Sequence, residues 1–233
     1  MRAAVVCAWV LAGLVAGGPR AVAQPVVGAA TRPAIPLYTT PLGIGMETHA
    51  YPYPVQFLPL EVEGEAVRMA FMDVVPTAPN GRAIVLLHGK NFYGGYFEPV
   101  IRDLLNAGYR VVVPDQIGFG KSSKPNIRYS FDLLAAHTAK LLDHLKVDKA
   151  AILGHSMGGM LAVRFARTYP RRTTHLVLEN PIGLGDYPAL GRSAAKDIPR
   201  CKLVELANVG HIPHLEAPER FGRVVVEFIG RND

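Results

Sequence analysis

The chain has 233 residues, of which 49% are hydrophobic and 19% are charged, and its formal net charge is +6. This length suits one sizeable α/β domain with a buried core. The basic residues are scattered without a Lys/Arg block, which argues against nucleic-acid binding, and two cysteines cannot form a disulfide framework or a cysteine metal cluster.

The first residues predict a cleavable secretory signal at 1–23. One arginine precedes an apolar run at 3–16, and residues 21–23 form a small-x-small cleavage site. The run is shorter than the roughly 20 residues of a membrane span, so no stable span is expected, with a retained anchor as the alternative. Cleavage after Ala23 would remove one of the two cysteines and place the protein in the periplasm or outside the cell.

Residues 24–56 predict an extended N-terminal leader that wraps the domain, with partial disorder as the alternative, because they are rich in Pro, Gly, Thr and Tyr and lack helical periodicity. The folded domain is expected to span 57–233. It begins with two alternating segments, FLPLEVEG and VRMAFMDVV, which predict an antiparallel hairpin over residues 57–75.

Beyond this hairpin, short apolar runs alternate with helical patterns. The runs are AIVLLHG, RVVVPD, AAILGHS, HLVLENP and KLVELAN, and their content of β-branched residues and leucine is typical of strands buried on both faces. Helices are expected over 130–146, with Ser130 as N-cap, and over 158–168 and 218–229. The alternation predicts a mostly parallel sheet with helices on both faces.

The strongest chemical signal is GHSMG at residues 154–158, a G-x-S-x-G pattern between a strand and a helix. Its glycines let the two backbones approach closely around a strained turn, which exposes the hydroxyl of Ser156. The helix N-terminus favours a developing negative charge there. Ser156 is therefore predicted to be a nucleophile; the alternative is a glycine turn whose serine merely caps the helix.

A second signal is LLHGKNFYGG at residues 86–95, directly after a predicted strand. A His-Gly pair here lets the loop fold back toward the serine. The backbone N–H of Lys90, with that of Met157, could then hold the oxyanion of a tetrahedral intermediate, and such donors are worth roughly 3–4 kcal/mol each. His88 is expected to be a structural hydrogen-bonding histidine.

The third signal is NVGHIPHLEAPERF at residues 208–221. His211 lies in a loop before the last helix and is the predicted general base, with His214 as its competitor. A metal site is not expected, because Pro213 lies between the two histidines and no third ligand is apparent. No cofactor is expected either, since DQIGFGKSS at 115–123 lacks the glycine spacing of a phosphate-binding loop.

In chain order, LLHGKNF, VVVPDQIGFGKSSKP, GHSMGGM, LVLENPIGL and GHIPHLEAPERF resemble the motifs of the α/β-hydrolase superfamily, over about residues 55–230. The resemblance implies an α/β-hydrolase fold and a serine-nucleophile, esterase- or lipase-like member. In such a member Ser156 attacks, His211 takes the proton, and the Met157 and Lys90 amides hold the oxyanion. Relatives that displace halide or open epoxides attack with aspartate. Serine instead implies cleavage of carboxylic esters of small molecules, or of related acyl or carbon–carbon bonds.

The sequence departs from the family at residues 179–199, where NPIGLGDY runs almost directly into PALGRSAAKDIP. We therefore expect the helical cap and the acid-bearing strand to be missing. The strand at 202–208 would then pair beside 175–181 or leave a gap.

With that strand missing, Glu179 is the predicted triad acid and Asp186 is second. A purely structural role for Glu179 is the alternative. Loss of the acid costs about four orders of magnitude in kcat in a serine protease. A truncated, weakly active or non-catalytic homologue is the alternative function.

Overall fold

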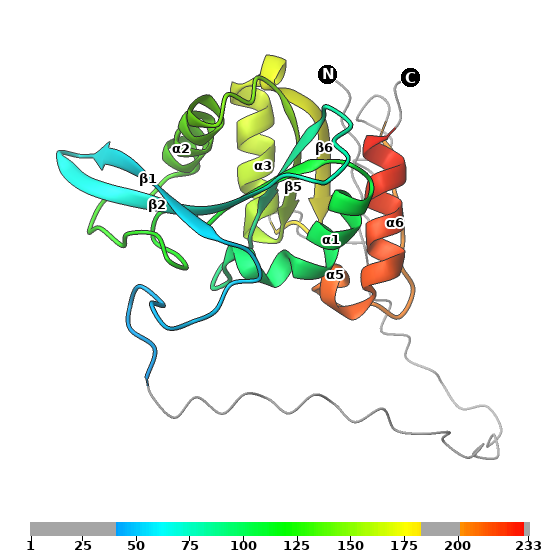
Figure 1. The fold of residues 1–233 in the computed structure, drawn as a ribbon, viewed down its shortest axis with the longest axis horizontal. Coiled ribbons are helices and arrows are strands. Elements are labelled where there is room, and N and C mark those ends of the chain that lie inside the picture. The colour runs from blue at the N-terminus through cyan, green and yellow to red at the C-terminus, as the bar shows by residue number, and fades with distance from the viewer. Residues whose placement is uncertain (1–40, 183–200, 231–233) are drawn as a thin grey trace.

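The computed structural model of the chain describes residues 41–182 and 201–230 (Figure 1). The predicted signal peptide at 1–23, the first part of the predicted leader and Asp186 lie outside the described residues. Among the helices that are described, none has the length and apolar content needed to cross a membrane.

Within the described residues, six strands form one sheet in the order β1-β2-β4-β3-β5-β6. The strands are β1 Val55–Val62, β2 Glu65–Val74, β3 Ala83–Leu87, β4 Arg110–Pro114, β5 Ala150–His155 and β6 Thr173–Glu179. β2 is antiparallel to both of its neighbours, whereas β4, β3, β5 and β6 run parallel. The predicted hairpin and the mostly parallel sheet are therefore confirmed.

Helices cover both faces of this sheet, as predicted. They are α1 Glu98–Asn106, α2 Phe131–His144, α3 Met157–Thr168, α5 Pro213–Glu216 and α6 Pro218–Ile229, with short 3₁₀ turns η1 Gly94–Phe97 and η2 Pro170–Arg172. Figure 1 shows α2 and α3 on one face and α1 and α6 on the other. The Ser130 side chain accepts the Leu133 N–H at 3.1 Å, which confirms it as the N-cap of α2. Helix α1 was not predicted.

The central strands divide their side chains between two cores. Val85 and Leu87 of β3 join the core under α2 and α3, whereas Ile84 and Leu86 join the core under α1 and α6. Successive residues of a strand point to opposite faces, so a strand covered by helices on both sides must be apolar at every position. This arrangement explains the uninterrupted apolar run in the sequence.

The strand predicted at 202–208 is wrong, because residues 201–208 form no strand, and β6 is the last strand of the sheet within the described residues. Their apolar side chains are nevertheless used. Cys201 and Leu203 pack against the α2–α3 core, and Leu206 and Val209 lie in the α1–α6 core. A run of apolar residues indicates that side chains on both sides of the segment are buried. The four side chains named above pack in this way, although the segment does not pair with a strand by backbone hydrogen bonds.

The described part of the leader is anchored to the domain by a buried carboxylate. Tyr51 donates its hydroxyl hydrogen to Asp115 Oδ2 at 2.6 Å, and burial together with that carboxylate raises the pKa of Tyr51. The same carboxylate accepts the N–H groups of Gly94 at 2.7 Å and Lys121 at 2.8 Å. Asp115 thereby ties three separate segments together after β4.

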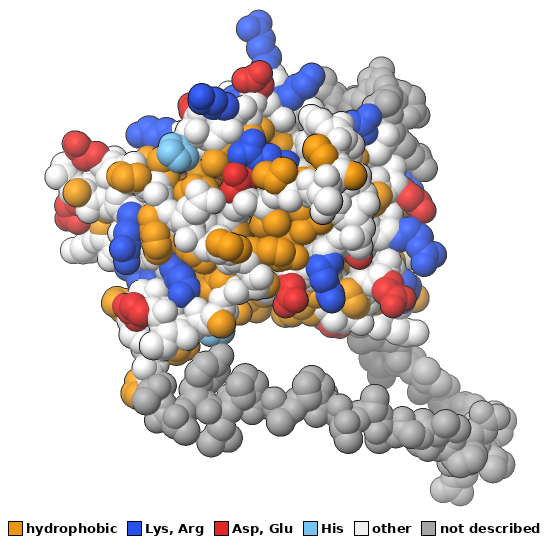
Figure 2. Space-filling view, viewed as in Figure 1, with side chains coloured by type: hydrophobic (Ala, Val, Ile, Leu, Met, Phe, Trp, Pro, Cys, Tyr) orange, Lys and Arg blue, Asp and Glu red, His pale blue; other side chains and the backbone are white. Residues whose placement is uncertain are grey.

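Some hydrophobic side chains remain at the surface. Figure 2 shows them gathered in the middle of one face, with charged side chains mostly around them. Tyr129, one of the large exposed residues, is 43% accessible to solvent. It borders a pocket beside the site described next.

Candidate active site

The turn between β5 and α3 is strained as the G-x-S-x-G pattern predicts. Ser156 has φ 54° and ψ −116°, in a region that non-glycine residues rarely adopt. A side chain at Gly154 would overlap the carbonyl of Gly158, and one at Gly158 would overlap the carbonyl of Leu87. Positions 154 and 158, two residues to either side of the serine, therefore require glycine, because backbone of the helix or of β3 fills the space of a Cβ.

The predicted nucleophile and base lie together. His211 Nε2 is 3.1 Å from Ser156 Oγ, although 55 positions separate the two residues. Ser156 is buried, whereas His211 is exposed. An imidazole nitrogen at this distance can take the hydroxyl proton as the oxygen attacks.

The loop after β3 folds back over the serine, as predicted. A Cβ built on Gly89 would lie 3.2 Å from the Cβ of Ser156. His88 fixes this loop by donating from Nδ1 to the Gly89 carbonyl at 2.9 Å and accepting the Gln116 N–H at Nε2, at 3.0 Å. Burial lowers the pKa of His88, which suits a neutral ring. Its predicted structural role is confirmed.

The two predicted oxyanion donors occupy suitable positions in the chain. Met157 is the first residue of α3, and the first N–H groups of a helix have no partner within it. Lys90 directly follows Gly89, whose backbone approaches the serine from the other side. Their roles stay predictions.

A hydrogen-bonded chain joins the oxyanion loop, the elbow and the base. Gly89 N–H donates to Tyr96 Oη at 3.1 Å, Tyr96 donates to His155 Nδ1 at 2.8 Å, and His155 Nε2 donates to the His211 carbonyl at 2.8 Å. A carbonyl can only accept, so Nε2 carries the hydrogen and Nδ1 accepts from the tyrosine. Burial lowers the pKa of His155 and raises that of Tyr96, which keeps both neutral.

Glu179 does not meet the predicted base, and this point of the sequence prediction is corrected. Its Oε1 accepts from His214 Nδ1 at 2.7 Å and from the His214 backbone N–H at 3.1 Å. Both side chains are 0% exposed. The single turn of α5 carries His214 inward to the end of β6, while His211 stays in the loop before it.

Near this pair, the described residues supply no carboxylate to His211 Nδ1, and no group of three His, Cys, Asp or Glu side chains in them could hold a metal ion. The backbone of Glu179 still serves the elbow, because its carbonyl accepts the Ser156 N–H at 3.0 Å. The structure thus separates the carboxylate–histidine pair from the serine–histidine pair.

An apolar pocket of about 360 Å³ lies beside the elbow, and no sequence motif predicts it. It is formed where the loop after β4 meets the first turns of α2 and α3. Its lining residues are Gly118, Phe119, Tyr129, Ser130, Phe131, Leu134 and Met157. Because Met157 directly follows the serine, the pocket can hold an apolar part of a molecule bound at Ser156.

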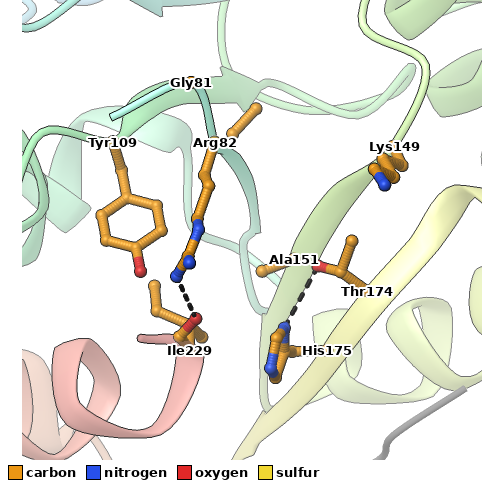
Figure 3. Close-up of a pocket in the computed structure, with 9 residues that line it drawn as sticks. Gly81, Arg82, Tyr109, Lys149, Ala151, Thr174, His175 and Ile229 are labelled. Carbon is orange, nitrogen blue, oxygen red and sulfur yellow. Dashed lines mark hydrogen bonds between the residues drawn. The ribbon is translucent and has the colours of Figure 1, made fainter. Parts of the chain in front are cut away.

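Another pocket, of about 280 Å³, lies at the opposite edge of the sheet, where the parallel strands begin (Figure 3). Arg82 there donates to the carbonyls of Ile229 at 3.4 Å and Gly230 at 3.2 Å, and so fastens the end of α6. Because Ser156 follows the carboxyl end of β5, this pocket is not part of the candidate site.

Known proteins share the fold of this chain. Residues 82–192 match the family model described as alpha/beta hydrolase fold. A probable hydrolytic enzyme from Pseudomonas aeruginosa PAO1 is 31% identical with a TM-score of 0.77, over 79% of this chain and 97% of that one. The chain belongs to the α/β-hydrolase family.

More distant structures agree on the fold alone. A thermophilic esterase from Thermogutta terrifontis is 20% identical with a TM-score of 0.64, over 75% of this chain and 98% of the other. Among curated proteins, the 2-hydroxy-6-oxo-6-phenylhexa-2,4-dienoate hydrolase of Burkholderia cepacia is 39% identical over 112 residues, which are 46% of this chain and 39% of that protein. The match therefore spans about two fifths of such curated relatives.

Proposed function

We propose that the protein is a serine hydrolase that cleaves carboxylic esters of small molecules through an acyl-enzyme. The observation that carries this proposal is the 3.1 Å approach of His211 Nε2 to Ser156 Oγ on a strained strand–helix turn. Membership of the α/β-hydrolase family supports hydrolysis in general.

In the proposed mechanism, Ser156 Oγ attacks the ester carbonyl while His211 Nε2 takes its proton. The Met157 and Lys90 amides hold the oxyanion of the tetrahedral intermediate. The imidazolium then protonates the leaving alcohol, which leaves an acyl group on the serine. Water, deprotonated by the same histidine, releases the carboxylic acid and restores the serine.

The histidine lacks a carboxylate partner within the described residues, and this affects the expected rate. In a serine protease whose triad acid is altered, kcat falls by about 10⁴, yet activity above that of water persists. We therefore expect slow turnover rather than none. The competing reading, a non-catalytic homologue, differs because it predicts no reaction of Ser156 at all.

The apolar pocket suggests which esters suit the site. Its three aromatic rings, from Phe119, Tyr129 and Phe131, surround a volume of about 360 Å³ next to Met157. We propose that it takes the apolar substituent of the substrate, a medium-length acyl chain or an aryl group, since such pockets bind chiefly by covering apolar surface.

A second candidate activity is cleavage of a carbon–carbon bond in an oxo-dienoate. It is favoured by three curated relatives that are 37–39% identical over 112–113 residues and are named as hydrolases of oxo-dienoates or related oxo-dioates. Loss of the absorbance of such a dienoate on mixing with the protein would favour this reaction; turnover of simple esters alone would favour the esterase.

We also propose that the protein is exported, on the strength of the apolar run at 3–16 and the small residues at 21–23. Protein recovered from the periplasm or the medium should begin at Gln24. Recovery only from the cytoplasm with an intact N-terminus would contradict export.

The direct test of the proposed function is covalent labelling by a fluorophosphonate, which reacts with activated serines. The wild type should be labelled at Ser156 and should hydrolyse p-nitrophenyl butyrate, whereas Ser156→Ala should do neither. A wild-type protein that melts cooperatively but is neither labelled nor active would refute the proposal.

A further inference from the structure

The loop that carries His211 is held by its backbone on several sides. Asn180 Nδ2 donates to the Gly210 carbonyl at 2.9 Å, and His155 Nε2 donates to the His211 carbonyl at 2.8 Å. The most extensive contact comes from Glu216. Its Oε2 accepts the Gly210 N–H, and its Oε1 accepts the Ile212 N–H at 2.9 Å.

Glu216 therefore binds the backbone one residue before and one residue after the base, His211. The carboxylate lies at the end of the single turn of α5 and reaches back to Ile212, the N-cap of that turn. This resembles the acid half of a capping box, with the acid one position later; the N-cap side chain, an isoleucine, makes no bond in return. Charge-assisted bonds to backbone N–H groups are roughly twice as strong as neutral ones.

The glycine that precedes the base is consistent with this pair of hydrogen bonds. A Cβ at Gly210 would overlap the Glu216 carboxylate. Gly210 is not among the residues with positive φ, so its backbone is open to any residue type. A side chain at position 210 would therefore have to displace the Glu216 carboxylate.

We propose that Glu216 is a positioning residue for His211: by binding the amides on both sides of the base it fixes the loop that holds Nε2 at Ser156 Oγ. The inference rests on the proposed function, because it assigns His211 the role of base. In the usual triad a carboxylate orients the imidazole through Nδ1. Here, within the described residues, a carboxylate binds the backbone N–H groups of the two residues on either side of the histidine.

The first test is Glu216→Gln, with Glu219→Gln as a matched control that removes a neighbouring exposed carboxylate. An amide can accept only one of the two N–H groups. We expect kcat for p-nitrophenyl butyrate to fall about tenfold with KM little changed, because misplacing a reacting group by about 1 Å costs up to 100-fold. Glu216→Asp keeps the charge but has a shorter side chain, so its kcat should lie between those of the wild type and Glu216→Gln. An unchanged kcat in Glu216→Gln would overturn the proposal.

A second test separates positioning from general destabilisation. Gly210→Ala should lower kcat because its methyl group displaces the carboxylate. In a Glu216→Ala background the same change should cost less than about twofold, since the obstacle is gone. Fold-changes that simply multiply in the double variant would overturn the proposal, as would losses of kcat that follow the melting temperature.

A third measurement does not depend on activity. Amide hydrogen exchange at Gly210 and Ile212 should be slow in the wild type and about tenfold faster in Glu216→Gln, while exchange in β5 stays unchanged. Equal exchange in the two proteins would mean that the contact is not made. If the contact is present but the wild type neither turns over nor is labelled, the proposed function fails and the positioning role fails with it.

Discussion

Replacing His211 by alanine should impair catalysis, whereas replacing His214 by alanine should lower the free energy of unfolding, although the two residues are only three positions apart. His214 and its partner Glu179 are both 0% exposed, and the alanine variant removes the Nδ1 donor at 2.7 Å. Glu179 Oε1 would keep only the backbone N–H at 3.1 Å. Breaking a buried pair by removing one partner costs about 3–5 kcal/mol.

The surroundings of His214 keep this cost high. Its ring centroid lies 4.5 Å from that of Tyr96, 4.7 Å from that of Phe97 and 6.2 Å from that of Phe221. Truncation therefore leaves a void among aromatic rings rather than a surface that water can reach. His211 is exposed, and its removal should change the free energy of unfolding by no more than about 0.5 kcal/mol.

Urea unfolding with linear extrapolation measures the stability half of this prediction. We expect His214→Ala to lose about 3–5 kcal/mol, which lowers Tm by roughly 6–20 °C in a domain of this size. Fluorophosphonate labelling measures the other half, and His211→Ala should react about 10³-fold more slowly or worse.

A stability within about 1 kcal/mol of wild type for His214→Ala would refute the reasoning from the buried pair. A larger loss of stability in His211→Ala than in His214→Ala would reverse the two roles. Adding Glu179→Gln to His214→Ala should restore part of the loss, because a neutral amide is less costly to bury than a carboxylate.

Three further outcomes are expected. Gly158→Ala should lower stability by about 1–3 kcal/mol and slow labelling, because its methyl group meets the β3 backbone; wild-type behaviour in both assays would contradict the close approach. Tyr129→Ala should reduce the preference for p-nitrophenyl hexanoate over acetate about fivefold, and equal losses for both esters would remove the pocket from the substrate site. Burial lowers the pKa values of His88 and His155, so the unfolded chain binds more protons than the folded one below about pH 6.5. The contribution of these two neutral rings to the free energy of unfolding should be complete above that pH. Below it, that free energy should fall by up to about 1.4 kcal/mol per pH unit for each ring; equal urea midpoints at pH 7.5 and 5.5 would contradict this.

Much of the fold could be predicted because its signals are local. The alternation over 57–75 and the uninterrupted runs of the parallel strands follow directly from which faces are covered. Helix α1 was missed although Val100, Ile101 and Leu104 are spaced for one buried face, because the segment is short and follows a glycine-rich loop. The segment 201–208 was misassigned because its apolar pattern does not distinguish a paired strand from a chain that packs at the sheet edge.

The candidate site was predictable where chemistry and chain order coincide, as for Ser156 and His211. The partner of Glu179 was not, because one helical turn decides which of two histidines faces inward. The hydrogen-bonded chain through Tyr96 and His155 joins residues 59 positions apart, and nothing in the local sequence marks it. Contacts of this kind depend on the assembled sheet and have no motif of their own.

The carboxylate of Asp115 affects the order in which segments of the protein can fold during synthesis. Tyr51 leaves the ribosome 64 residues before the residue that binds its hydroxyl, so the leader must wait until β4 is in place. The turn at Gly94 needs the same carboxylate and is completed in the same late step. A nascent chain that ends before Asp115 should leave residues 41–54 open to protease, whereas the full chain should protect them. Residues 41–54 can thus dock only after Asp115 has been made, and their docking coincides with completion of the loop that faces the serine.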